Sequence, residues 1–222
     1  MSEIKGAIFD LDGTLIDSMY VWEKVDRDFL AQRGIPVTAE YTDAMRKMFF
    51  ETAAQYTIET YHLKETVEEI TKIWLDMARY EYEHHVRCKP FVHQYLDKLK
   101  SEKIRLGMAT SSDPYLLEPV MKNNGLDKYF DQICYTSEVG RNKSNPDIYL
   151  YTARKLGIQP EKCVVFEDIP EGINGALKAG MKTVAVFDQA SGNCIDIMRN
   201  NADMFIMGYD EILEVDIWKE TD

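Results

Sequence analysis

From Pro90 onward, short apolar segments with strand composition alternate with segments of helical periodicity. The predicted strands are 104–109, 132–135, 163–166, 183–186 and a weaker 204–206, and the predicted helices are 91–100, one ending near Asn124, 146–156 and 172–179. An earlier apolar segment, Ile4 to Phe9, predicts one more buried strand. Parallel strands joined by helices of this length form right-handed crossovers. We therefore predict an α/β fold with a doubly wound, Rossmann-like parallel sheet.

The stretch between the first strand and Pro90 has a different pattern. Apolar residues recur at helical spacing from Met19 to about Val86, with Gly34-Ile35-Pro36 as a break. This pattern predicts an all-helical insertion. We expect an α/β core formed by residues 1–17 and 88–222, a helical cap formed by 18–87, and hinges where the two join.

Pro119 falls inside the helix expected after Ser112. Proline lacks the backbone N–H that an interior helical position donates. We therefore expect this helix to begin late or to be kinked.

Charge and composition exclude several classes of protein. The chain has 26 Lys and Arg against 38 Asp and Glu, a formal net charge of -12, which opposes binding to nucleic acid or to an anionic membrane surface. Its four cysteines form no C-x-x-C pair, no signal region stands at the N-terminus, and no apolar run is long enough to span a membrane. We expect a cytoplasmic monomer with reduced thiols, whose partner is a small molecule.

Residues suited to phosphate chemistry stand just beyond four of the predicted strands. In chain order they are Asp10 and Asp12, Thr110 and Ser111, Lys143, and Glu167 and Asp168. The carboxyl ends of parallel strands share one edge of a sheet, and ligands bind at that edge. We therefore expect these side chains to converge on one crevice.

The chemistry of such a crevice follows from its residue types. Asp10, Asp12 and Asp168 offer the hard oxygen ligands that Mg²⁺ prefers. A carboxylate such as Asp10 attacks phosphorus when a metal and a fixed cation, here Lys143, neutralise the phosphoryl oxygens. The hydroxyl of Thr110 and loop amides hold those oxygens as charge develops, and Asp12 exchanges a proton with the leaving group.

These motifs resemble, in order and strand context, the four motifs of the haloacid dehalogenase superfamily. They are Asp10-Leu11-Asp12-Gly13-Thr14-Leu15, Thr110, Lys143 followed by Pro146-Asp147, and Glu167-Asp168. The likeness covers essentially the whole chain and is closest to the branch with a helical cap, which includes β-phosphoglucomutases, phosphoglycolate phosphatase and pseudouridine monophosphate phosphatase.

The resemblance implies a role for each matching residue. Asp10 is then the nucleophile; Asp12 is the general acid and base and also gives a backbone carbonyl to magnesium; Asp168 is a direct metal ligand, and Glu167 is an acidic partner behind it. Two positions depart from the family pattern: Asn142-Lys143-Ser144 replaces the frequent Gly-Lys-Pro, and Thr110 replaces serine. Both departures keep the functional group, the lysine ammonium and the hydroxyl.

Other interpretations of single motifs carry less weight. An isolated D-x-D-G is most often a turn, and a calcium loop of the helix-loop-helix type would need other residues at Leu15 and Val21. Gly172, Gly175 and Gly180 lack the spacing of a dinucleotide site and fit packing and capping glycines instead. Phe49 and Phe50 stand in an expected turn between cap helices, and we assign them no role.

Three functions remain open. The leading one is a magnesium-dependent phosphatase that hydrolyses a small phosphorylated metabolite through an aspartyl-phosphate on Asp10. A phosphosugar mutase of the β-phosphoglucomutase type is the alternative, and a non-catalytic relative that binds a metabolite or a protein is a third. In the mutases a histidine stands ten residues after the general acid, whereas this chain has Trp22 there.

Overall fold

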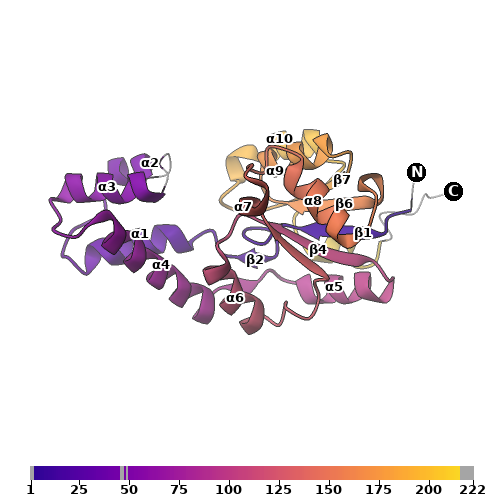
Figure 1. Cartoon of the computed structure of the whole chain (residues 1–222), viewed down its shortest axis with the longest axis horizontal. Helices are drawn as coiled ribbons and strands as arrows, with labels where there is room; N and C mark the ends of the chain where they lie inside the picture. Colours follow the sequence, from indigo (N-terminus) through magenta and orange to yellow (C-terminus); the bar gives the residue numbers. More distant parts are fainter. Residues whose placement is uncertain (1–2, 46–47, 49, 216–222) are drawn as a thin grey trace.

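Six parallel strands form the central sheet of the computed structural model, which describes residues 3–45, 48 and 50–215 (Figure 1). The strands are β1 (Gly6–Phe9), β4 (Arg105–Thr110), β5 (Gln132–Tyr135), β6 (Cys163–Glu167), β7 (Lys182–Val186) and β8 (Met204–Ile206). Their order is β5-β4-β1-β6-β7-β8, and every neighbouring pair is parallel. The chain order thus reverses at β1, with β4 on one side and β6 on the other. This arrangement confirms the doubly wound sheet.

Side chains alternate between the two faces of the sheet, as the period of a strand requires. Ala7 and Phe9 of β1 pack in one cluster with α5 (Val92–Ser101) and α6 (Pro114–Asn123). Ile8 packs on the other face with α8 (Asp147–Leu156) and α9 (Pro170–Lys178). Both faces are apolar and covered, which explains why the central strands β1 and β6 are wholly buried.

Two short helices complete this part of the fold. α7 (Thr136–Val139) lies between β5 and α8, and α10 (Ile195–Asn201) packs on α9 before β8. The sequence pattern predicted neither of them. Each spans two turns of helix or fewer, which is too short for apolar periodicity to be visible.

The helical insertion consists of α1 (Val21–Ala31), α2 (Ala39–Met45), α3 (Phe50–Tyr61) and α4 (Val67–His84). It forms one end of the molecule, and the described ends of the chain lie at the other (Figure 1). The expected apolar stripes pack α1 on α4: Phe29 of α1 meets Trp74 of α4 edge to face, with ring centroids 5.6 Å apart. Thr66 begins α4 with a capping box.

The two connections between sheet and insertion lie side by side. β2 (Ile16–Asp17) pairs antiparallel with β3 (Arg87–Cys88), although 69 residues lie between Asp17 and Arg87 in the sequence. Two residues per strand give no visible sequence pattern, and neither strand was predicted. This pairing keeps the entry to α1 close to the end of α4.

Pro119 neither ends nor delays α6, which starts at Pro114 and continues to Asn123. The missing N–H of Pro119 frees the carbonyl of Tyr115, four residues earlier. The guanidinium of Arg79 on α4 donates a hydrogen bond to that carbonyl, and its carbon lies 4.2 Å from the centre of the Tyr115 ring. The proline therefore creates a contact between α6 and the helical insertion.

Pro90 lies two residues before the start of α5. Phe91 between them has the left-handed φ of 64°, and the helix begins only at Val92. Within the described residues, no helix combines the length and apolar character needed to cross a membrane.

Candidate active site

The residues singled out from the sequence meet at the carboxyl edge of the sheet. Asp10 directly follows β1, Thr110 ends β4, and Glu167 ends β6, with β1 between β4 and β6. A cavity of about 620 Å³ opens there, and five of the predicted residues line it: Asp10, Asp12, Ser111, Lys143 and Asp168. The two others, Thr110 and Glu167, are fully buried behind it.

Lys143 lies at the centre of this group. Its ammonium contacts a carboxylate oxygen of Asp10 and lies 2.7 Å from Oε1 of Glu167. Burial lowers the pKa of Lys143, but the charges of Asp10 and Glu167 outweigh burial, so the pKa is raised overall. Lys143 is therefore a fixed cation beside the predicted nucleophile.

Three buried carboxylates surround one point. Single oxygens of Asp10, Glu167 and Asp168 all lie within 4.8 Å of one another. Burial raises the pKa of each of them, that of Glu167 to about 7. The charge of Asp10 adds to the rise at Glu167 and Asp168, and the charge of Asp12 adds to the rise at Asp10. Oε2 of Glu167 is buried and has no hydrogen-bond partner in the described structure. A divalent cation with a preference for oxygen ligands fits this donor set and would relieve the repulsion.

The carboxylate of Asp12 lies outside this trio, and the ligand that we expect from Asp12 is its backbone carbonyl. Glu167 joins Asp10 and Asp168, whereas the carboxylate of Asp12 accepts hydrogen bonds elsewhere, from the hydroxyls of Ser18, Tyr82 and Ser112. Glu167 ends a strand and points inward beside Asp10. Sequence spacing does not reveal this direction.

Two glycines let the acidic residues approach closely. Gly13 has φ of 78°, and a Cβ there would lie 2.3 Å from an Asp168 oxygen. A Cβ on Gly172, in the first turn of α9, would lie 2.4 Å from the Glu167 carboxyl carbon. The packing role expected for Gly172 is thus confirmed, and any side chain at either position would displace a carboxylate.

Hydroxyl groups orient the acidic residues from behind. The hydroxyl of Tyr149 on α8 donates to Oε1 of Glu167 at 2.8 Å. Thr14 and Ser191 each place a hydroxyl 3.4 Å from an oxygen of Asp168. Sequence reasoning missed Tyr149 and Ser191, because neither stands in a motif.

The side chain of Thr110 stabilises the turn after β4 and does not line the cavity. Its side chain is fully buried, and its Oγ1 accepts a hydrogen bond from the backbone N–H of Ser112 at 3.0 Å. Ser111, the next residue, lines the cavity. Of the two residues expected to offer a hydroxyl, only Ser111 therefore lines the cavity.

The helical insertion supplies the opposite wall. Trp22, Phe50, Leu75 and Tyr82 all line the cavity, and Trp22 meets Phe50 edge to face with centroids 5.4 Å apart. Phe50 therefore faces the cavity, whereas Phe49 lies outside the described residues. This wall of the cavity thus carries three aromatic side chains, those of Trp22, Phe50 and Tyr82.

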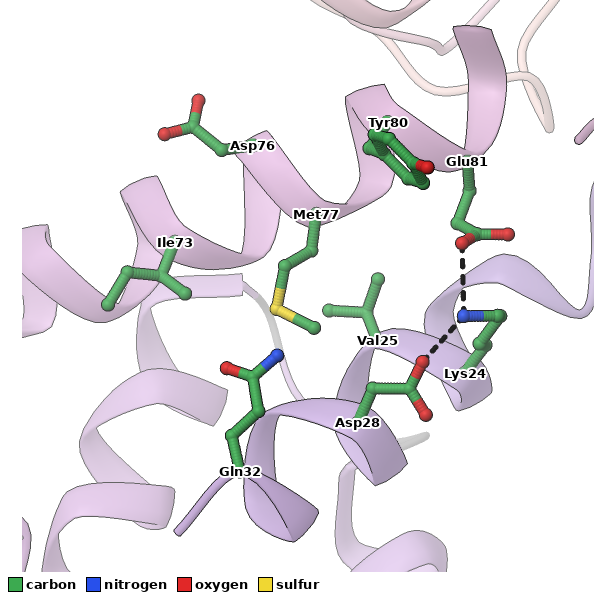
Figure 2. A pocket seen from close by; sticks show the side chains of 9 residues that line it. All are labelled: Lys24, Val25, Asp28, Gln32, Ile73, Asp76, Met77, Tyr80 and Glu81. Atoms are coloured by element: carbon green, nitrogen blue, oxygen red, sulfur yellow. Dashed lines mark hydrogen bonds and ion pairs between the residues drawn. The ribbon is translucent and has the colours of Figure 1, made fainter. Parts of the chain in front are cut away.

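A second cavity, of about 460 Å³, lies between α1 and α4 (Figure 2). None of the predicted site residues lines it. Its one lysine, Lys24, is 2.5 Å from Asp28 and 3.0 Å from Glu81. Because these charges satisfy one another, we place the active site at the sheet edge and not here.

Comparison with known proteins agrees with this geometry. The sequence model of the haloacid dehalogenase-like hydrolase family matches residues 7–186 of this chain. A phosphorylated carbohydrates phosphatase of Thermotoga maritima is 27% identical over 82% of this chain and 84% of its own length. A fructose-1-phosphate phosphatase of Escherichia coli K12 is 32% identical over 82% of this chain and 95% of its own.

A solved structure agrees as well. A Thermotoga maritima protein provisionally named a β-phosphoglucomutase superposes with a TM-score of 0.82 at 26% identity, covering 95% of this chain and 97% of the other. Together with the four motifs at one sheet edge, these matches show that the chain belongs to the haloacid dehalogenase-like hydrolase family.

Proposed function

We propose that this chain is a magnesium-dependent phosphatase that hydrolyses a small phosphorylated metabolite through an aspartyl-phosphate on Asp10. One observation carries the proposal: the carboxylate of Asp10 contacts the buried ammonium of Lys143 at the floor of a cavity large enough for a metabolite. The names of the relatives support a phosphoric monoester hydrolase. Residues 18–87 then act as the cap over a core formed by 1–17 and 88–222.

In the first step an oxygen of Asp10 attacks phosphorus, and the bond from phosphorus to the ester oxygen breaks. Asp12, which lines the same cavity, gives its proton to the departing oxygen. Lys143 holds a positive charge beside the developing charge on the phosphoryl oxygens, with the hydroxyl of Ser111 nearby. The product alcohol leaves, and Asp10 carries the phosphoryl group.

In the second step water attacks the same phosphorus atom, and the bond from phosphorus to the Asp10 oxygen breaks. Asp12 takes the proton from water and so returns to its starting state. Inorganic phosphate leaves, and the Asp10 carboxylate is restored. Asp12 thus gives and receives one proton per turnover.

Magnesium fits the cluster of Asp10, Glu167 and Asp168, and when bound there it neutralises phosphoryl charge. The backbone carbonyl of Asp12 completes the proposed protein ligands. Lys143 pairs with Glu167 as well as with Asp10. Its positive charge reduces the repulsion between these carboxylates and the phosphate group of a substrate. Tyr149 holds Glu167 in place.

The test is release of inorganic phosphate. The purified chain should hydrolyse p-nitrophenyl phosphate in magnesium, lose that activity in a chelator, and regain it when magnesium returns. A panel of phosphorylated metabolites, sugar phosphates included, then identifies the substrate. Absence of phosphate release from every ester would overturn the proposal.

A mutase is the second candidate, because one similar structure carries that provisional name. Trp22 lies on the cavity wall where the mutases have a histidine. An indole offers only an N–H donor and cannot act as an acid or base near neutral pH. We therefore prefer hydrolysis.

A further inference from the structure

The carboxylate of Asp12 is held by three hydroxyl groups. Oδ1 accepts from Ser18 at 2.6 Å and from Tyr82 at 2.5 Å, and Oδ2 accepts from Ser112. Ser18 precedes α1, Ser112 follows β4, and Tyr82 lies near the end of α4. The proposed acid and base is therefore oriented from both sides of the cavity.

Tyr82 is suited to hold a carboxylate. Its side chain is 3% exposed, and burial, followed by the charge of Asp12, raises its pKa well above the ordinary value. The phenol therefore keeps its proton and donates it in a hydrogen bond. This bond is strongest once Asp12 has given up its proton, because a hydrogen bond to an ionised group is stronger than one between neutral groups.

Contacts on two sides fix the position of Tyr82. On one side, the neighbouring residue Glu81 pairs with Lys24 of α1 at 3.0 Å, as the dashed line in Figure 2 shows. Glu81 is itself buried, and this pair links α4 to α1 next to Tyr82. Because α1 begins three residues after Ser18, the same brace relates Ser18 to Tyr82.

On the other side, α6 of the sheet domain holds α4. Tyr115 donates from its hydroxyl to Asp76 at 3.0 Å, and its carbonyl, freed by Pro119, accepts from Arg79. One residue beyond Tyr82, the carbonyl of Glu83 accepts a hydrogen bond from the side-chain amide of Asn123 at 2.5 Å. The segment that carries Tyr82 is thus attached to the domain that carries Asp12.

We propose that Tyr82 is a positioning residue that aims the carboxylate of Asp12 at the leaving-group oxygen. The inference rests on the proposed phosphatase function and adds a residue outside the four motifs. Without the phenol, Asp12 keeps the bonds from Ser18 and Ser112 but loses the donor contributed by α4. Proton transfer to the leaving group then becomes less efficient, while attack by Asp10 is unaffected.

The experiment compares two esters of similar shape. Phenyl phosphate needs a proton on its departing oxygen, since phenol has a pKa of about 10 like tyrosine, whereas p-nitrophenyl phosphate releases a more acidic phenol. For Tyr82→Phe we expect kcat/KM to fall about tenfold or more with phenyl phosphate and less than about threefold with p-nitrophenyl phosphate. The ratio kcat/KM reports only the steps up to phosphoryl transfer, so the later attack by water does not enter.

Two further variants make the test specific. In an Asp12→Asn background, adding Tyr82→Phe should cause no further loss, because the phenol acts through Asp12. Tyr80→Phe is the matched control: Tyr80 lies two residues earlier on α4, is 56% exposed, and lines the other cavity. It should change neither ester.

Each alternative outcome decides against the proposal. Equal losses with both esters, or a loss that persists in the Asp12→Asn background, would assign Tyr82 a purely structural role. Thermal unfolding checks that Tyr82→Phe is folded. If it is not, Ser112→Ala replaces it, because this variant removes the hydrogen bond to the other oxygen of Asp12 and should give the same selective loss with phenyl phosphate. An equal loss with both esters in Ser112→Ala would overturn the positioning role. If the wild type hydrolyses neither ester, the phosphatase function itself fails, and the role of Tyr82 with it.

Discussion

Lys143 places its ammonium 2.7 Å from Oε1 of Glu167 while also contacting Asp10, and all three side chains are buried. One cation thus compensates two carboxylates that burial alone would neutralise. Breaking a buried ion pair is costly because the remaining charges have no partner. The floor of the candidate active site is therefore a part of the fold as well as of the proposed chemistry.

Lys143→Met should weaken both properties. We expect the free energy of unfolding to fall by about 3–5 kcal/mol without metal and phosphate release to fall at least about 100-fold. Urea unfolding in a chelator and phosphate detection measure the two effects. Lys182→Met is a matched control, since Lys182 pairs with Asp203 at 2.7 Å but is 40% exposed, and it should cost under about 1 kcal/mol. An unchanged free energy of unfolding for Lys143→Met would show that its ion pairs with Asp10 and Glu167 do not stabilise the fold.

Asp10→Asn tests the nucleophile. An amide keeps the size of the side chain but cannot attack phosphorus as an anion, so turnover should fall at least about 10³-fold with the fold intact. Circular dichroism and phosphate release provide the measurement. Asp127→Asn, at an exposed position outside the cavity, should leave turnover unchanged. Substantial activity in folded Asp10→Asn would remove Asp10 from this role.

Most of the sheet and its reactive edge were predictable, because strands of this kind have a short apolar pattern and end in polar residues. Asp10, Lys143 and Asp168 were expected at one crevice, and the structure brings them together there. The topology of parallel strands places these residues at one edge regardless of the details of packing.

The remainder depends on directions that sequence spacing does not encode. Glu167 and Asp168 are adjacent, and only the structure shows that both approach Asp10. Tyr82 comes from a helix 70 residues away from Asp12, and its spacing on α4 looks like that of any buried aromatic residue. Side-chain hydrogen bonds between distant segments therefore need coordinates.

Asp168→Ala should weaken metal binding before anything else. Its carboxylate belongs to the acidic cluster, so the magnesium concentration for half-maximal activity should rise at least about tenfold, and part of the activity should return at high magnesium. Titration of magnesium against phosphate release measures this shift. If the metal dependence of the variant matches the wild type, Asp168 is not a ligand.

Asp26 on α1 should make the stability depend on pH. Burial, and then the charge of Glu23, raises its pKa to about 7, against about 4 in an unfolded chain. The folded state therefore holds this proton more tightly, so stability is highest below pH of about 4 and is lost as the pH rises to about 7. Above that value the loss is complete.

Asp26→Asn removes the titrating proton and should raise the free energy of unfolding at pH 8 by about 1–2 kcal/mol relative to wild type, with little gain at pH 4. Urea unfolding at the two pH values measures the difference. Glu118→Gln, at an exposed position on α6, should show no comparable gain at pH 8. An equal gain for Asp26→Asn at both pH values would show that burial of the charge is not the cause.

Trp22 decides between hydrolysis and transfer. It lines the cavity, lies edge to face with Phe50 at 5.4 Å, and stands ten residues after Asp12, where the mutases have a histidine. An indole at this position offers no acid or base to favour a sugar hydroxyl over water, so we expect Asp12, the proposed acid and base, to activate water instead. With β-glucose 1-phosphate and a trace of the bisphosphate, we expect inorganic phosphate to accumulate without glucose 6-phosphate.

Trp22→His is the informative companion variant, and any rise in glucose 6-phosphate would show that this position controls the acceptor. Formation of glucose 6-phosphate by the wild type, faster than phosphate release, would establish a mutase instead.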